Sequence, residues 1–161
     1  MLPLSRRALV ASLAWALSGS IIAALAQTPS FAGNWRWSRA KSTIAPGEPV
    51  PNDVVLAIAA ADAGRVQWTL TRVDAKGGTF VETYSGTGDG KPAAVTGAAP
   101  GTMARFTVTP TTLTSAYAYG DGSAERATCT LSSDGRVMTC AGSDDDGKGH
   151  TSSYRDVFDR Q

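Results

Sequence analysis

The stretch ATCTLSSDGRVMTCA, residues 127–141, decides the expected fold because it has the pattern of a complete β-hairpin. Alternating side chains on both sides flank a turn sequence that ends in Asp134-Gly135. If these two residues form a type I′ turn, Cys129 on the first strand lies directly opposite Cys140 on the second. A directly opposed pair without mutual hydrogen bonds brings its Cα atoms to about 4.5 Å. The spacing therefore predicts a structural Cys129–Cys140 disulfide, with two free core thiols as the alternative.

The sequence from residue 27 onward repeats this pattern of short alternating runs between turn signals. Val66, Trp68 and Leu70, for example, share one face of a run whose other face is polar. Closing an antiparallel meander of such runs into a barrel removes its exposed edges, although a two-sheet sandwich is the competing architecture. The Pro-rich stretch 43–52 should be a surface loop of the kind that often crosses a barrel mouth. We therefore expect an all-β barrel of about eight or nine strands, at 31–38, 53–61, 64–73, 79–86, 102–109, 112–119, 124–131, 136–142 and 150–159.

Residues 1–26 have the three parts of a secretory signal: a basic start, an uncharged apolar run, and small residues before an expected cleavage site at Gln27. The expected organisation is thus a signal helix followed by one β-barrel domain, 27–161. A retained membrane anchor is the alternative. The paired arginines near the start partly resemble a twin-arginine signal, so both this route and the general secretory route stay open. We expect a periplasmic or secreted protein, in a compartment that permits disulfides.

Charge argues against partners that need a strongly charged surface. The chain has 15 Lys and Arg against 14 Asp and Glu, and two of the arginines leave with the signal peptide. A near-neutral domain has no electrostatic footprint for nucleic acid or anionic lipid. We expect no nucleic-acid partner, no membrane association after signal cleavage, and a monomer.

The segment FAGNWRWSRAKS, residues 31–42, is similar to the opening F-x-G-x-W-x-x-x-x-x-K-S of small exported bacterial lipocalin-like proteins. The likeness extends loosely to the aromatic and charged ending YRDVFDRQ. It implies a lipocalin-like barrel in which Gly33 and Trp35 lie at the closed end and a late arginine, Arg160 or Arg155, packs on the Trp ring. Most such proteins have no assigned activity, so the resemblance bears on the fold more than on the function.

The sequence offers little for catalysis, metal binding or cofactor binding. His150 is the single histidine, and nothing places it beside a nucleophile and an orienting acid. The acidic run 144–146 concentrates oxygen ligands without the spacing of a calcium loop, which favours a solvated turn. We assign no catalytic residue, no metal site and no cofactor. A hydrolase or isomerase acting through Arg105, Tyr117 or Glu82 is the least favoured hypothesis.

Aromatic residues at alternating strand positions are the strongest indication of function. If the barrel closes, several of them face its interior, and a small barrel either packs solid or holds one small ligand. A basic side chain among them would receive an acidic head group. We expect a protein that binds a small, mostly apolar molecule without chemistry; the alternative is an envelope protein–protein interaction module with a solid core. The candidates for lining a cavity are Trp37, Trp68, Phe80, Tyr84, Arg105, Phe106 and Tyr117.

Overall fold

The structure, a computed structural model, describes residues 29–45 and 47–161; the expected signal peptide and its cleavage site lie outside the described residues. The described residues form antiparallel strands, and none of them belongs to a helix long and apolar enough to cross a membrane. The strands are β1 (Gly33–Trp37), β2 (Asp53–Ala61), β3 (Val66–Val73), β4 (Thr79–Gly86), β5 (Ala93–Thr96), β6 (Met103–Val108), β7 (Thr112–Ala118), β8 (Ala124–Leu131), β9 (Val137–Asp145) and β10 (Thr151–Arg160).

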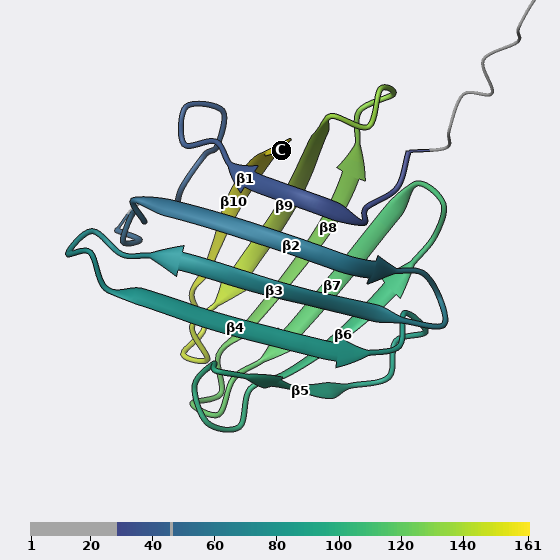
Figure 1. Cartoon of the computed structure of the whole chain (residues 1–161). Coiled ribbons are helices and arrows are strands. Elements are labelled where there is room, and N and C mark those ends of the chain that lie inside the picture. The colour runs from purple at the N-terminus through teal and green to yellow at the C-terminus, as the bar shows by residue number, and fades with distance from the viewer. Residues whose placement is uncertain (1–28, 46) are drawn as a thin grey trace, which may run out of the picture.

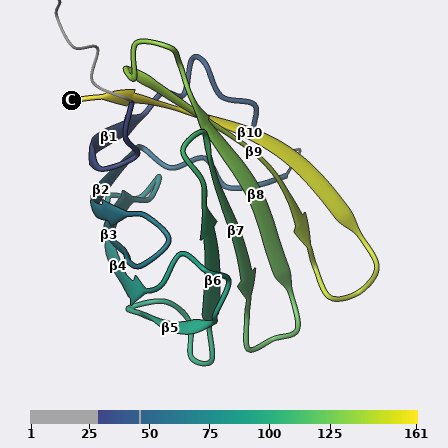
Figure 2. The same cartoon turned by 90° about the vertical axis from the view of Figure 1, so that its right-hand side faces the viewer.

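These strands form one closed barrel in which each pairs with its sequence neighbours and β1 also pairs with β10 (Figure 1). Figure 2 shows β6 to β10 side by side along one side of the barrel. The predicted closed meander is confirmed, with ten strands among the described residues in place of eight or nine. The strand that the sequence did not reveal is β5, which has four residues between Pro92 and Gly97. Because Pro and Gly punctuate loops, so short a run between them has the pattern of a loop.

Alternation along each strand divides the side chains between the interior and the outer surface. On β3, Val66 and Trp68 are buried, whereas the residues between and after them are more exposed. The largest buried side chain is Trp35, which is 0% exposed. Full burial of one large apolar side chain contributes about 1.5–3 kcal/mol. The other buried members of this core are Phe31, Val54, Ile58, Val66, Trp68, Tyr84, Val95, Ala104, Phe106, Leu113, Cys129, Met138, Cys140 and Phe158.

The hairpin of β8 and β9 has the predicted register but a different turn. Cys129 lies opposite Cys140, and the two form the predicted disulfide. A loop of this length stabilises the fold by about 2–3 kcal/mol. The type I′ prediction is wrong, because that turn needs positive φ at both central residues. Gly135 has φ 67°, but Asp134 does not have a positive φ. Instead, the Gly135 N–H donates to Ser132 O at 2.8 Å, which widens the loop without changing the face of either strand.

One end of the barrel is closed by Trp35 and Arg160. The Arg160 guanidinium carbon lies 4.1 Å from the centroid of the Trp35 ring. Its N–H groups also donate to Gly135 O at 2.7 Å and Ala32 O at 2.8 Å. A Cβ on Gly33 would meet Arg160 Nη1 at 2.2 Å, and Gly33 has φ 142°. Glycine at this position therefore lets the guanidinium cover the ring.

Candidate functional site

A cavity of about 520 Å³ opens at the end of the barrel opposite Trp35. Two loops border its opening: the Pro-rich loop, through residues 44–45 and 48–51, and the loop at 98–102. The Pro-rich loop is pinned to β10, because Thr43 and Arg155 exchange two backbone hydrogen bonds at 2.8 and 3.0 Å. A deeper hollow of about 160 Å³ shares several lining residues with the cavity and reaches the disulfide. Cavities of about 300–1,000 Å³ are typical of small-molecule sites.

Aromatic rings make up much of the cavity wall and continue into the core. The Tyr117 and Tyr119 rings stack at 6.2 Å with an angle of 10° between their planes. The Phe106 ring is nearly perpendicular to the Tyr117 ring, with 5.9 Å between their centroids. Such contacts hold the rings in fixed orientations. The aromatic residues that line the cavity are Trp37, Trp68, Tyr117, Tyr119, Tyr154 and Phe158.

Glu125 on β8 accepts hydrogen bonds from two phenols inside the barrel. The Tyr119 hydroxyl donates to Glu125 Oε2 at 2.9 Å, and the Tyr154 hydroxyl donates to Glu125 Oε1. Burial is the main cause that raises the pKa of both phenols, and the charge of Glu125 is the second cause. The tyrosines therefore stay protonated and keep the carboxylate fixed against the aromatic wall.

Asp156 on β10 is a second interior carboxyl group. It accepts a hydrogen bond from Trp37 Nε1 at 2.7 Å. Burial raises the pKa of Asp156, while the Trp37 hydrogen bond acts in the opposite direction. This bond spans the β1–β10 pairing that closes the barrel, so it orients both an acid and a ring of the cavity wall.

Asp144 on β9 lies directly opposite Glu125 in the β8–β9 ladder. Burial raises the pKa of Asp144 to about 6, with further contributions from the charges of Glu125, Glu48 and Asp156. Glu48 and Glu82 also line the cavity, and the single basic side chain among its lining residues is Arg72. The described wall of the cavity thus combines rings with an excess of carboxyl groups.

The structure brings together some of the residues that the sequence singled out. Trp37, Trp68 and Tyr117 line the mouth cavity, and Phe106 lines the deeper hollow. Tyr84 is buried in the core beside Trp68, with their rings stacked at 5.8 Å.

Two other candidates lie outside the cavity. Phe80 is 45% exposed and packs against Arg72, whose guanidinium carbon lies 5.3 Å from the Phe80 ring centroid. Arg105 is exposed on the outer face, so its assignment to the interior is wrong. The physical reason is the strand period of two: Phe106 faces inward, and its neighbour Arg105 must face outward.

Apart from Glu82, sequence reasoning missed the carboxyl groups, and it did not place Tyr119 or Tyr154 among the candidates for lining the cavity. A signal was nevertheless present in the predicted hairpin register. Because Cys129 faces inward, Glu125 four residues earlier shares its face. By the same count, Asp144 shares the face of Cys140 and lies opposite Glu125.

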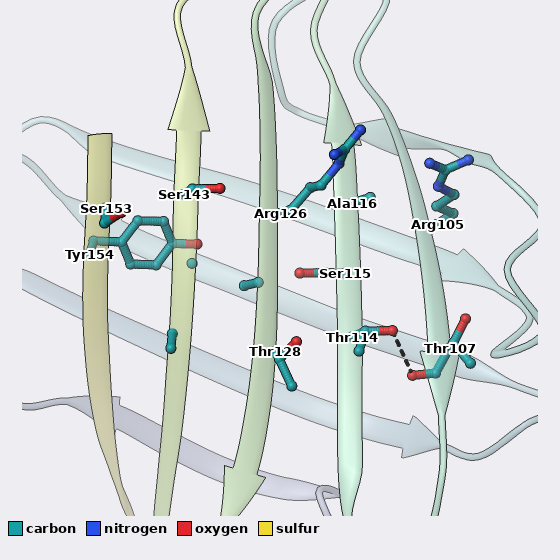
Figure 3. A pocket seen from close by; sticks show the side chains of 13 residues that line it. Arg105, Thr107, Thr114, Ser115, Ala116, Arg126, Thr128, Ser143, Ser153 and Tyr154 are labelled. Carbon is teal, nitrogen blue, oxygen red and sulfur yellow. Dashed lines mark hydrogen bonds between the residues drawn. The ribbon is translucent and has the colours of Figure 1, made fainter. Parts of the chain in front are cut away.

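A second hollow, of about 650 Å³, lies on the outer face of β6 to β10 (Figure 3). Arg105, Ala116, Arg126 and Ser143 form one row across four paired strands, with Thr and Ser hydroxyls beside them. Both arginines are exposed. Charges on such an open surface are screened by water and salt, whereas the mouth cavity is enclosed on several sides by rings. The mouth cavity is therefore the candidate site.

No protein-family model matches this sequence, and comparison with curated proteins gave no match. Among solved structures, that of EF1p2_mFAP2b bound to DFHBI is similar to this chain, with 12% sequence identity and a TM-score of 0.47. The similarity covers 81% of this chain and 93% of that chain.

Proposed function

We propose that this protein binds one small organic molecule in the mouth cavity and performs no chemistry on it. The observation that supports this proposal is a cavity of about 520 Å³ with aromatic walls and a few oriented polar groups. Such a combination of apolar surface for affinity and sparse polar groups for orientation is characteristic of ligand sites.

The ligand has an apolar, preferably aromatic, part that lies toward the barrel floor. Leu70, Trp68 and Phe158 line both the cavity and the deeper hollow. The Trp68 ring also contacts the core ring of Phe106, with 6.2 Å between their centroids. Burying an aromatic ring there removes apolar area from water and adds favourable ring–ring contacts. The polar end of the ligand lies beside the carboxyl groups and phenols described above.

The barrel acts after export, in the periplasm or outside the cell, as a member of the lipocalin-like exported proteins. The Cys129–Cys140 disulfide supports an oxidising compartment. The packing of Arg160 on Trp35 beside Gly33 supports the lipocalin-like relationship, because it reproduces the arrangement that the resemblance implies.

Indole N–H signals in a ¹H–¹⁵N NMR spectrum of the purified protein test the binding proposal. Small aromatic compounds are added one at a time, and the shifts of Trp37 and Trp68 report on the cavity. Trp35, at the closed end, is the internal control. We expect some compounds to shift the two cavity signals while leaving Trp35 unchanged. Shifts confined to the N–H signals of Arg105 and Arg126, on the outer face, would refute the proposal.

A further inference from the structure

The charges of the cavity differ from those of the whole chain. The chain has 15 basic and 14 acidic side chains, which are nearly balanced. The described residues that line the cavity include five acids and one base, Arg72. Arg72 is itself exposed and packs on Phe80. The excess of acid is therefore a local property of this site. The five acids are Glu48, Glu82, Glu125, Asp144 and Asp156.

The interior carboxyl groups have neutral partners in place of cations. Glu125 accepts from two phenols, and Asp156 accepts from the Trp37 indole. Each ion pair found among the described residues lies elsewhere: Arg36–Asp53, Lys41–Asp159, Lys91–Asp89 and His150–Asp146. Moving a carboxylate out of water without a counter-charge is costly. A cation that enters the cavity would offset this cost.

Tyr117 provides an observation that is independent of the acids. It lines both the cavity and the deeper hollow, and its phenol is buried deeply enough to raise its pKa well above the ordinary value. Within the described part of the chain its hydroxyl has no hydrogen-bond partner, although the neighbouring Tyr119 and Tyr154 hydroxyls both bind Glu125. Tyr117 is half-buried and lines the cavity, so its hydroxyl is available to a ligand there.

On the basis of the proposed binding function, we infer that the ligand is an organic cation: an aromatic or alkyl amine whose ammonium group lies between Glu125, Asp144 and Asp156. Aromatic rings line the same cavity as these carboxyl groups, and ring faces attract cations that carry carbon substituents. A hard metal ion instead requires several converging oxygen ligands. Among the described residues, no three His, Cys, Asp or Glu side chains converge closely enough to hold a metal ion.

This inference changes the expected chemistry of the ligand. A basic residue inside the barrel would have suited an acidic head group, but Arg105 lies outside. An anionic ligand would face repulsion from the carboxyl groups that line the cavity. The apolar part of the ligand keeps the role given above.

Three probes of matched shape test the inference: phenylbutylamine, phenylbutanol and phenylbutyrate, which are cationic, neutral and anionic at neutral pH. Their dissociation constants are measured by following the Trp37 and Trp68 indole signals. We expect the amine to bind at least about tenfold more tightly than the alcohol, and the carboxylate to bind most weakly.

Asp144→Asn and Asp145→Asn provide matched variants. Both remove one charge from β9, but Asp145 is exposed on the outer face and its oxygen accepts from Gly147 N–H, a role that Asn retains. We expect Asp144→Asn to lose most of the preference for the amine over the alcohol, and Asp145→Asn to keep it. Thermal unfolding of both variants verifies that they are folded.

The two proposals fail in different ways. Equal or tighter binding of the alcohol or the carboxylate at the cavity signals would overturn the cation inference and leave small-molecule binding intact. An amine preference that survives Asp144→Asn unchanged would also overturn it. If none of the three probes shifts Trp37 or Trp68, both the inference and the binding proposal are wrong.

Discussion

The Trp37 indole donates a hydrogen bond of 2.7 Å to Asp156 and so joins β1 to β10 inside the cavity. This bond therefore links the β1–β10 pairing, which closes the barrel, to the wall of the candidate site. Without it, the half-buried carboxyl group of Asp156 would have no side-chain donor among the described residues.

Replacement of Trp37 by Phe should therefore destabilise the barrel by about 1–3 kcal/mol near neutral pH. Because the indole N–H lowers the pKa of Asp156, its removal raises that pKa further. A carboxyl group with a raised folded-state pKa destabilises the fold when charged, and this cost disappears as pH falls and the group takes up a proton. Urea unfolding at neutral and acidic pH should show a smaller loss at acidic pH.

Arg36→Gln is the control for Trp37→Phe. Arg36 lies next to Trp37 on β1 but forms an exposed ion pair with Asp53 at 3.0 Å. Losing such a pair should cost less than about 1 kcal/mol. An equal loss for Trp37→Phe at both pH values would contradict the role given to Asp156.

Asp144→Asn should stabilise the ligand-free protein while weakening amine binding. The pKa of Asp144 is about 6, above its ordinary value, because its charged form is poorly solvated and faces other acids. In the folded state this group takes up its proton at higher pH than in the unfolded chain, so wild-type stability rises as pH falls through about 6. Thermal melts should show a higher melting temperature for the variant than for the wild type above this pH. The difference between the two should become smaller below it. A variant less stable than wild type at about pH 8 would be the opposite result.

Amine affinity should fall as the solution becomes acidic. Protonation of Asp144, with a pKa of about 6, removes negative charge from the cavity while the amine keeps its own charge. Calorimetric titrations at about pH 7.5 and about pH 5 should show weaker amine binding at the lower value, with little change for phenylbutanol. Stronger amine binding in acid would contradict the cation site. The titratable groups that face Asp144 are Glu125 on β8, Asp156 and Tyr154 on β10, Tyr119 after β7, and Glu48 in the Pro-rich loop.

Gly33→Ala should loosen the closed end of the barrel. The new methyl group would meet Arg160 Nη1 at 2.2 Å and would also occupy a backbone position with φ 142°. We expect a loss of about 2 kcal/mol or more in urea unfolding, because strain and a displaced guanidinium add together. Gly149→Ala measures the contribution of backbone strain alone, because Gly149 has φ 95° but no atom within 4 Å of the added carbon. Equal losses at the two glycines would show that the Arg160–Trp35 contact contributes little.

The sequence predicted the fold more completely than it predicted the site. Alternation and turn spacing predicted a closed antiparallel barrel, and the Cys129–Cys140 register followed from a single hairpin. The missing strand, β5, is too short for its periodicity to appear. The turn at Asp134-Gly135 was misjudged because a Gly in the left-handed region serves several loop lengths.

The site was harder to predict because it depends on closure. Isolated acids in a strand usually face solvent, and Glu125, Asp144 and Asp156 lie on three different strands. Only the combined β8–β9–β10 register places them on one interior wall. The interior assignment of Arg105 was inconsistent with that of Phe106, because neighbouring residues of a strand face opposite sides of the sheet.

Intermolecular nuclear Overhauser effects between phenylbutylamine and the protein locate the bound probe directly. The binding proposal predicts contacts from the phenyl protons of the probe to the indole protons of Trp68 and Trp37. The methylene next to nitrogen should contact the ring protons of Tyr154 and Tyr119, beside the carboxyl groups. Contacts to the methyl groups of Thr107 and Thr128, on the outer face of β6 and β8, would contradict a binding site inside the barrel.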